Sequence, residues 1–168
     1  MKKTLFFLLI LSILVTSCYK PPEQNRVIIP VDVKPGEMKT FAETSNEICK
    51  EDNKPIIRMF GTTWCPHCKW ISPTFDRIVQ EYLSQGKIAA YHWNTDTGND
   101  ELTSFQESSV PITEIAIYNK FNERGSVPTF VFGCKYFRIG NGYEAQNNLQ
   151  AEETEFRTVI EKLIEESK

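Results

Sequence analysis

The sequence predicts one α/β domain built on a central mixed sheet of four to five strands that is flanked by helices. Three observations predict it. Short apolar runs alternate with amphipathic segments of helical period, a C-x-x-C pair lies where a strand meets a helix, and two β-rich runs join as a hairpin. The chain has 168 residues, of which 40% are hydrophobic, and this is enough to bury one core.

The N-terminal segment has the composition of an export signal rather than of a folded element. Two lysines precede an apolar run over residues 5–15, which is too short to span a bilayer comfortably. Residues 14–18 then resemble the bacterial lipobox, in which Cys18 would be lipidated. An ordinary signal peptide with a coincidental cysteine is the alternative. We expect a signal peptide at 1–17 and an exported protein of the cell envelope or periplasm, anchored to a membrane by lipid on Cys18.

Residues 18–36 begin as a polar, proline-rich stretch and are expected to form a tether and a first edge strand. The folded domain is therefore expected over residues 37–168. Between residues 37 and 53, apolar residues recur loosely at helical spacing, which predicts a helix that ends before Pro55. These apolar residues are Met38, Phe41, Ala42, Ile48 and Cys49.

Two strands and a helix are predicted next. Residues 55–60 and 87–93 are short, mostly apolar runs, which suits buried strands. Between them, apolar residues at spacings of three and four predict an amphipathic helix over residues 68–85, with Pro73 as a kink. The C-x-x-C pair therefore lies at the N-terminus of a helix.

The second half of the chain is predicted to contain a loop, two helices and a hairpin. The polar stretch 94–100 predicts a loop, and residues 101–109 a turn or two of helix. An apolar pattern opened by a proline predicts a helix over 111–122. The runs 127–132 and 136–139 are joined by a glycine-containing turn. The last helix has apolar residues at i, i+3, i+4, i+7 and i+8, namely Phe156, Val159, Ile160, Leu163 and Ile164.

Charge and cysteine content restrict the function classes. Nineteen basic residues against 22 acidic ones give a net charge of -3, and the basic residues are scattered, which argues against nucleic acid as a partner. Lipidation of Cys18 would leave four of the five cysteines, which pair as disulfides in an oxidising compartment. Cys65 and Cys68 are the first candidate pair.

The order of elements and the residues at their junctions resemble the thioredoxin superfamily over residues 26–168. The residues that carry the resemblance are Trp64-Cys65-Pro66-His67-Cys68, Lys69, Pro73, Arg124-Gly125, Val127-Pro128-Thr129 and Gly140 or Gly142. The Cys-Pro-His-Cys tetrapeptide and Val127 are similar to the DsbA type of disulfide oxidase. The tryptophan before the first cysteine, Lys69 and Pro73 are similar to thioredoxin itself. The resemblance implies a thioredoxin-like fold with a short insertion, between residues 94 and 111, before the helix that precedes a cis-proline.

The C-x-x-C pair is expected to carry the catalysis. A thiol at a helix N-terminus meets unpaired backbone N–H groups and the positive end of the helix dipole, which favour its thiolate. Cys65 is therefore expected to be the nucleophile, and Cys68, one turn further on, the resolving cysteine. His67 would add positive charge or a donor near the Cys65 thiolate and so favour a more oxidising couple. Pro66 removes a backbone donor and fixes its φ angle.

The resemblance further implies that substrate binds beside the pair. A cis peptide between Val127 and Pro128 would expose the Val127 backbone to an extended substrate, with Thr129 next in the motif. A trans proline that opens a strand is the alternative. Trp64 is a candidate substrate platform, although core or rim packing is the commoner role of a tryptophan.

Thioredoxin and DsbA carry a buried carboxylate six residues before the first active-site cysteine, and this sequence departs from that pattern. Met59 occupies the position here, so a proton relay through that acid cannot be transferred. A C-x-x-C pair is also half a zinc site, but Cys49, Cys134 and His92 are single, separated candidates, and we expect no metal. His92 is expected to be structural.

The leading hypothesis is a cell-envelope thiol–disulfide oxidoreductase that exchanges disulfides with protein cysteines and works with a membrane redox partner. It would need no cofactor beyond the Cys65/Cys68 dithiol. His67 and Val127 favour an oxidase, whereas Lys69, Pro73 and the small insertion favour a reductase. The alternative is a non-catalytic metal-binding or adhesion module on the same scaffold.

Topology is expected to bring Cys49 and Cys134 to one end of the domain. The strand at 55–60 runs toward the active site, so Cys49, which precedes it, lies at the far end. In the resembled fold the strand after Pro128 runs antiparallel to it, so the hairpin turn with Cys134 reaches the same end. We predict a structural disulfide between them; two independent buried thiols are the alternative.

Overall fold

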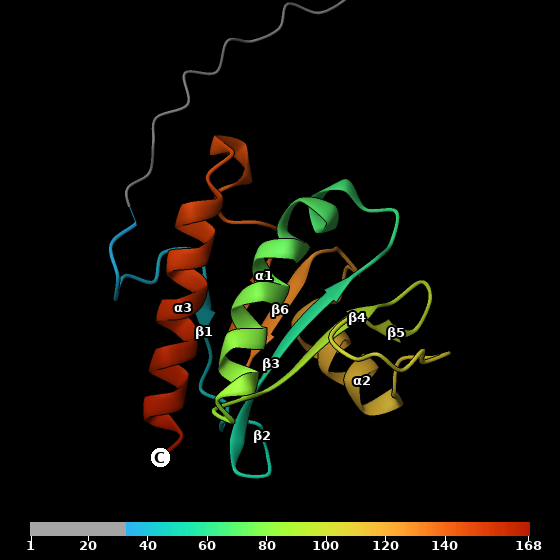
Figure 1. The fold of residues 1–168 in the computed structure, drawn as a ribbon, viewed down its shortest axis with the longest axis horizontal. Coiled ribbons are helices and arrows are strands. Elements are labelled where there is room, and N and C mark those ends of the chain that lie inside the picture. Colours follow the sequence, from blue (N-terminus) through green and yellow to red (C-terminus); the bar gives the residue numbers. More distant parts are fainter. Residues whose placement is uncertain (1–32) are drawn as a thin grey trace, which may run out of the picture.

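The computed structural model describes residues 33–168, which form a mixed sheet with helices on both faces (Figure 1). The strands follow the order β1-β7-β6-β3-β4-β5, and β2 pairs with β3 beside this path. Their bounds are β1 Ala42–Glu43, β2 Lys50–Glu51, β3 Lys54–Gly61, β4 Ala89–Asn94, β5 Asn99–Asp100, β6 Thr129–Phe132 and β7 Tyr136–Ile139. The helices are α1 Pro66–Ser84, α2 Ile112–Phe121, the 3-10 helix η1 Glu144–Gln146 and α3 Leu149–Glu166. The predicted α/β class is confirmed, and the strand number exceeds the expected four to five because three strands are only two residues long.

Strand β3 is the centre of the sheet. It pairs in parallel with β4 and antiparallel with β6, and all its residues except the first are buried. Its nearly continuous apolar sequence follows from this position, because helices cover both of its faces. β3 runs from the end of the domain that carries β2 to the end at which α1 begins. The C-x-x-C segment therefore lies at the carboxyl end of β3.

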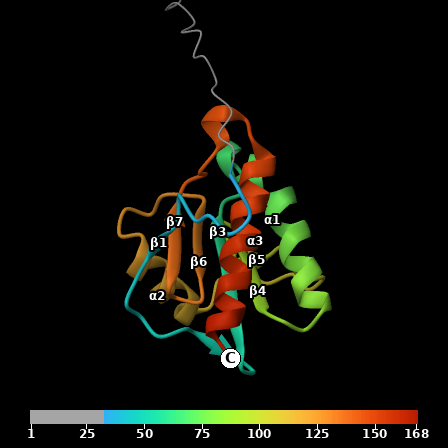
Figure 2. The same cartoon turned by 90° about the vertical axis from the view of Figure 1, so that its left-hand side faces the viewer.

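Helices α1 and α3 pack against each other on one face of the sheet, and α2 covers the other face (Figure 2). The layer under α1 and α3 is centred on five phenylalanine rings with centroids 5.0–6.5 Å apart. They are Phe41, Phe75, Phe130, Phe132 and Phe156. Phe75 lies two helical turns after Cys68, so this cluster fixes the active-site helix over the sheet.

A buried ion cluster lies within the same layer. The Arg138 guanidinium lies 4.8–4.9 Å from the ring centroids of three of these phenylalanines. It donates to Glu152 at 2.6 Å and lies 3.6 Å from Glu155, and the side chains of all three are at most 4% exposed. Because the charges are paired inside the core, the cluster fastens β7 to α3 without leaving an isolated buried ion.

The helix predicted at residues 37–53 is wrong. In its place, β1 pairs with β7, and β2 folds back onto the start of β3. The backbone N–H groups of Thr44 and Cys49 donate to carbonyls of the β6–β7 hairpin at 2.8 and 2.9 Å, while Phe41 enters the core. The apolar positions therefore reflect long-range pairing rather than a helical repeat. The structure has an edge strand at Ala42–Glu43, and most of residues 18–36, where the first edge strand was expected, lie outside the described residues.

The insertion after β4 also differs from expectation. Residues 101–109 form turns and bends rather than helix, and β5 lies within the predicted loop. Asp100 Oδ1 accepts from the N–H groups of His92 and Leu102 at 2.8 and 3.1 Å, so its side chain ties the insertion to β4. Gly98, at φ 79°, lets the loop cross itself, since a Cβ there would lie 2.4 Å from Ser109 Cα. The remaining predicted strands, hairpin and helices are present.

The predicted signal peptide at 1–17, the lipidated Cys18 and most of the tether lie outside the described residues. Within residues 33–168, none of the helices combines the length and apolar character that crossing a membrane requires.

Candidate active site

The C-x-x-C pair opens helix α1 directly after β3. Cys65 is the N-cap residue, and its Sγ accepts a hydrogen bond from the Cys68 backbone N–H at 3.2 Å. Pro66 follows at the first helical position, where its missing N–H costs nothing because first-turn N–H groups have no partner within the helix. The positive end of the helix dipole therefore lies at the Cys65 sulfur, an arrangement that favours a thiolate nucleophile.

The two active-site sulfurs are unbonded and lie in different surroundings. Cys65 is 3% exposed and caps the helix, whereas Cys68 is 2% exposed and lies inside its first turn. Burial, and then the hydrogen bond with Cys65, raises the pKa of the Cys68 thiol to about 12. Cys68 therefore keeps its proton at neutral pH until a base accepts it.

The loop before β6 lies beside the Cys65 sulfur. The peptide bond between Val127 and Pro128 is cis, and Cys65 Sγ donates to the Val127 carbonyl at 3.7 Å. The side chain of Trp64, next to Cys65 in the chain, is 68% exposed. The cis Val127–Pro128 peptide and the exposed Trp64 therefore both adjoin Cys65, and their role in substrate binding stays a prediction.

The side chain of Thr129 points into the domain. Its side chain is fully buried, its hydroxyl donates to the Ser126 carbonyl at 2.8 Å, and it accepts from Asn122 Nδ2 at 2.7 Å. Because both bonds face inward, the Thr129 side chain holds the cis-proline loop in place and does not present itself to a substrate.

His67 makes contacts that the sequence does not predict. Its Nδ1 lies 2.8 Å from Glu144 Oε1 in η1, and its side chain is 61% exposed. Asn141 donates to the His67 carbonyl at 3.0 Å and to the Glu144 carboxylate at 2.8 Å. The segment between β7 and α3 therefore braces the active-site turn. A carboxylate this close also offsets part of the charge that a protonated His67 would present to Cys65.

A cleft of about 260 Å³ adjoins Cys68, and Asp76, His92 and Glu101 are among the residues that line it. His92 is 2% exposed, and its Nδ1 lies 2.7 Å from Asp76 Oδ1. Strand register places His92 directly beside Met59. The sequence alone predicts only a structural role for His92 and none for Asp76. Two features of the sequence could have indicated the contact: Asp76 is an acid next to apolar positions of α1, and His92 lies on β4, the strand that pairs with β3.

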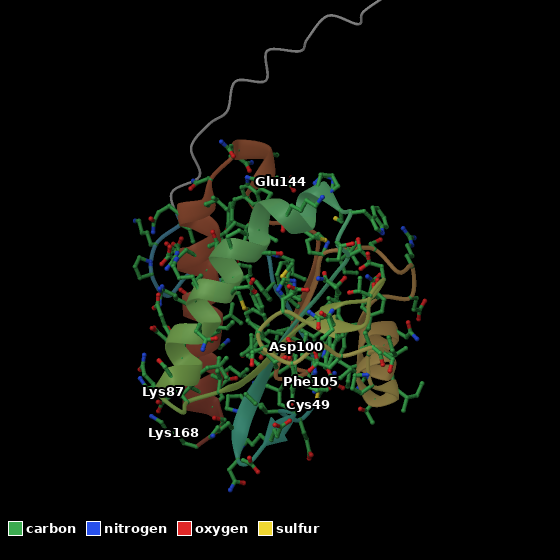
Figure 3. All side chains as sticks on the ribbon, turned by 45° about the vertical axis from the view of Figure 1, so that its right-hand side comes forward. Cys49, Lys87, Asp100, Phe105, Glu144 and Lys168 are labelled. Carbon is green, nitrogen blue, oxygen red and sulfur yellow. A yellow bond between two sulfur atoms is a disulfide. The ribbon has the colours of Figure 1, made fainter. Side chains whose placement is uncertain are left out.

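A second cysteine pair lies at the other end of the sheet. Cys49 and Cys134 are joined by a disulfide, with their Cα atoms 5.4 Å apart. Cys49 and Glu144, which contacts the active-site turn, lie toward opposite ends of the domain (Figure 3). The two bonded sulfurs are therefore not available as metal ligands for the C-x-x-C pair. Over residues 33–168, no three His, Cys, Asp or Glu side chains gather closely enough to hold a metal ion.

Comparison with known proteins identifies the relatives of the chain. The sequence model of the family described as "Thioredoxin" matches residues 37–132. The chain is 34% identical over 87 residues to "Thioredoxin M-type, chloroplastic" of Spinacia oleracea, and 28% identical over 111 residues to the protein of the same name from Pisum sativum. It is 24% identical over 83 residues to "Probable protein disulfide-isomerase A6" of Medicago sativa.

These matches cover 49%, 62% and 49% of this chain, and 45%, 62% and 22% of the three relatives. The chain thus spans less than two thirds of each of these relatives. The family match includes the C-x-x-C pair and the Val127–Pro128 loop, and it ends before Cys134 and α3.

Proposed function

The chain belongs to the thioredoxin family, and from this premise we propose that it is an oxidoreductase that exchanges disulfides with protein cysteines through Cys65 and Cys68. The observation that carries the proposal is the asymmetry of the two sulfurs. Cys65 caps the N-terminus of α1, whereas Cys68 is buried and its pKa is raised to about 12. Disulfide exchange needs one sulfur that attacks and a second that stays protonated until it resolves the intermediate.

The exchange is a two-step transfer of two electrons. In the reducing direction, the Cys65 thiolate attacks one sulfur of a substrate disulfide, and the other sulfur leaves with the electron pair and takes a proton. Cys68 then loses its proton and attacks Cys65 Sγ, the bond between Cys65 and the substrate breaks, and the second substrate sulfur leaves as a thiolate. The oxidising direction is the reverse. The Cys65/Cys68 pair supplies both electrons as a dithiol or accepts both as a disulfide, so we propose no further cofactor.

An extended segment of a protein substrate is proposed to bind across the rim made by Trp64, Val127 and Pro128. Support comes from the exposed Trp64 ring and from the proximity of the Val127 carbonyl to Cys65 Sγ, which puts main-chain hydrogen-bonding groups next to the reacting sulfur. The aromatic ring would supply apolar contact that tolerates many sequences.

Oxidation is the proposed direction, with reduction as the second candidate. A protonated His67 next to Cys65 would stabilise the thiolate, hence the reduced form, which makes a couple more oxidising. The Cys-Pro-His-Cys resemblance to the DsbA type points the same way. Lys69, Pro73 and the likeness to plant thioredoxins favour the reductase. Either direction needs a redox partner, and we propose one in the membrane.

The cell envelope is the proposed location, with lipid on Cys18 as the anchor. The proposal rests on the signal-like residues 1–17 and on the lipobox-like sequence that follows them. A disulfide at Cys49–Cys134 suits an oxidising compartment, because cytosolic thiols are kept reduced.

Two single variants test the proposed exchange. Cys65→Ser is expected to abolish disulfide exchange with a reduced or oxidised model peptide. Cys68→Ser is expected to leave a mixed disulfide between Cys65 and the peptide, visible by non-reducing mass spectrometry, because the attack persists and the resolution is lost. The assignment fails if Cys68 is alkylated first and Cys65 is inert. A wild-type protein that neither oxidises the peptide nor reduces insulin would instead support a non-catalytic module.

A further inference from the structure

His92 lies on the face of the sheet that packs against the helix carrying Cys68. In the parallel pairing of β3 with β4, Met59 is the direct partner of His92, and Gly61 is the partner of Asn94. Residues two apart on a strand share a face, so His92 and Asn94 both face α1, the helix that carries Cys68. A Cβ placed on Gly61 would lie 3.5 Å from Cys68 Sγ, so the sulfur packs against the Gly61 backbone, two residue pairs along the sheet from His92.

The hydrogen bonding of His92 leaves one ring nitrogen free. Nδ1 lies 2.7 Å from Asp76 Oδ1, and a carboxylate can only accept, so Nδ1 carries the hydrogen. Nε2 of the neutral ring then has an open lone pair. It is buried and has no hydrogen-bond partner among residues 33–168. The ring itself is fixed, because its edge packs against Phe75 with centroids 5.9 Å apart.

Cys68 and His92 border the same cleft. Cys68, Asp76 and His92 line one cavity of about 260 Å³, which is large enough for several water molecules at roughly 30 Å³ each. Transfer between Cys68 Sγ and His92 Nε2 would run through solvent in this cleft, without direct contact of the two side chains.

We propose that His92, oriented by Asp76, takes the proton from Cys68 when Cys68 attacks and returns it when Cys68 leaves. The proposal rests on the exchange proposed above and gives that reaction its general base. When a mixed disulfide at Cys65 is resolved, the S–H bond of Cys68 breaks, the proton goes to His92 Nε2, and the electron pair forms the S–S bond with Cys65. When a substrate thiolate attacks Cys65 of the oxidised pair, Cys68 leaves with the electron pair and takes the proton back.

The other charged groups at the cleft are already engaged or cannot accept a proton. Asp76 holds His92 Nδ1, and Asp100 accepts from the His92 backbone N–H at 2.8 Å. Glu101 Oε1 accepts from Asn94 at 2.6 Å and from Asn99 at 3.0 Å. Lys69, the remaining charged residue of the cleft, is cationic at neutral pH. His92 Nε2 is thus a buried acceptor beside this site that no protein donor among residues 33–168 occupies, and a neutral imidazole is a stronger base than a carboxylate.

A two-phase reaction with an aromatic disulfide distinguishes an effect of His92 on Cys68 from an effect on the nucleophile Cys65. When the reduced protein meets 5,5'-dithiobis(2-nitrobenzoate), attack by Cys65 releases a first coloured thiolate, and attack by Cys68 on the mixed disulfide releases a second. In stopped flow at pH 7, His92→Asn is expected to slow the second phase at least tenfold and to change the first phase less than twofold. Asparagine keeps a donor for Asp76 but cannot carry a proton. The second-phase rate of the variant should rise in proportion to hydroxide, whereas the wild-type rate should depend less steeply on pH.

Two variants on helix α1 keep the test decisive if His92→Asn is poorly folded. Asp76→Asn removes the carboxylate that fixes the ring and should slow the second phase while changing the first phase less than twofold. Glu81→Gln removes one negative charge from the same helix outside the cleft and should leave both phases unchanged. The proposal is overturned if the second phase keeps its rate and pH profile in both cleft variants, or if both phases slow by one common factor. Absence of the first phase in the wild type would instead overturn the proposed exchange, and the role of His92 with it.

Discussion

Replacing Cys49 and Cys134 together by alanine is expected to lower the free energy of unfolding by about 4–5 kcal/mol. The bond joins residues 85 positions apart, and a cross-link of that span removes much of the conformational entropy of the unfolded chain. The folded state should keep its geometry without the bond, because the Cys49 N–H still donates to the Gly133 carbonyl at 2.9 Å and the Ile56 N–H to the Cys49 carbonyl at 3.2 Å. The loss should therefore reflect the unfolded chain, and it corresponds to a fall in melting temperature of roughly 10–20 °C.

Urea unfolding measures this loss without interference from the redox pair if both proteins compared also carry Cys65→Ala and Cys68→Ala. The background protein should lose stability when a strong reductant is added, and the protein without Cys49 and Cys134 should not respond. The reasoning is refuted if the two proteins differ by less than about 1 kcal/mol. Recovery of the two peptides unlinked, from material never exposed to reductant, would refute the bond itself.

Three further outcomes are expected from the site and the core. His67→Ala should lower the reduction potential measured against glutathione, since positive charge near the Cys65 thiolate is lost; an unchanged potential would remove the main argument for an oxidase. Arg138→Met should lower the free energy of unfolding in urea by about 3–5 kcal/mol, because two buried carboxylates lose their partner, and a loss under 1 kcal/mol would contradict this. The pKa of the Cys68 thiol rises from 9.0 to about 12 on folding, so the folded reduced protein keeps a proton that the unfolded chain releases. Stability should be full below pH 9 and fall from there toward pH 12, and Cys68→Ala should lack this part of the decline; equal slopes between pH 8 and 10 would contradict it.

Local periodicity was sufficient to predict the elements that bury a continuous face. The apolar spacing of α3 and the apolar run of β3 both report burial by neighbouring layers, and the structure has both elements near the predicted bounds. Residues 37–53 show where such reasoning fails. Phe41 packs 5.0 Å from Phe132, a residue 91 positions away, and no pattern within the segment encodes that contact. The two-residue strands are likewise defined only by their partners.

The part of the site whose residues are adjacent in the sequence could be predicted. Cys65 and Cys68 could be assigned because a strand, a C-x-x-C pair and a helix follow one another. The contact of His92 with Asp76 joins β4 to α1 across 16 positions, and its meaning depends on the register that sets His92 beside Met59. Register between parallel strands is fixed by tertiary packing. The absence of an acid at Met59 could therefore be predicted from the sequence, whereas the pairing of Met59 with His92 could not.

The length of β3 also decides which sulfurs can meet. Cys49 lies before this eight-residue strand and Cys65 after it, and an extended strand of that length spans roughly 26 Å. Thiol–disulfide exchange requires one sulfur to touch another, so a thiolate or mixed disulfide at Cys65 cannot reach the bond between Cys49 and Cys134 within the same folded molecule. The strand thus keeps the structural disulfide out of reach of the active-site thiols. Of the four cysteines in the domain, only the pair at the carboxyl end of β3 can take part in exchange with a substrate.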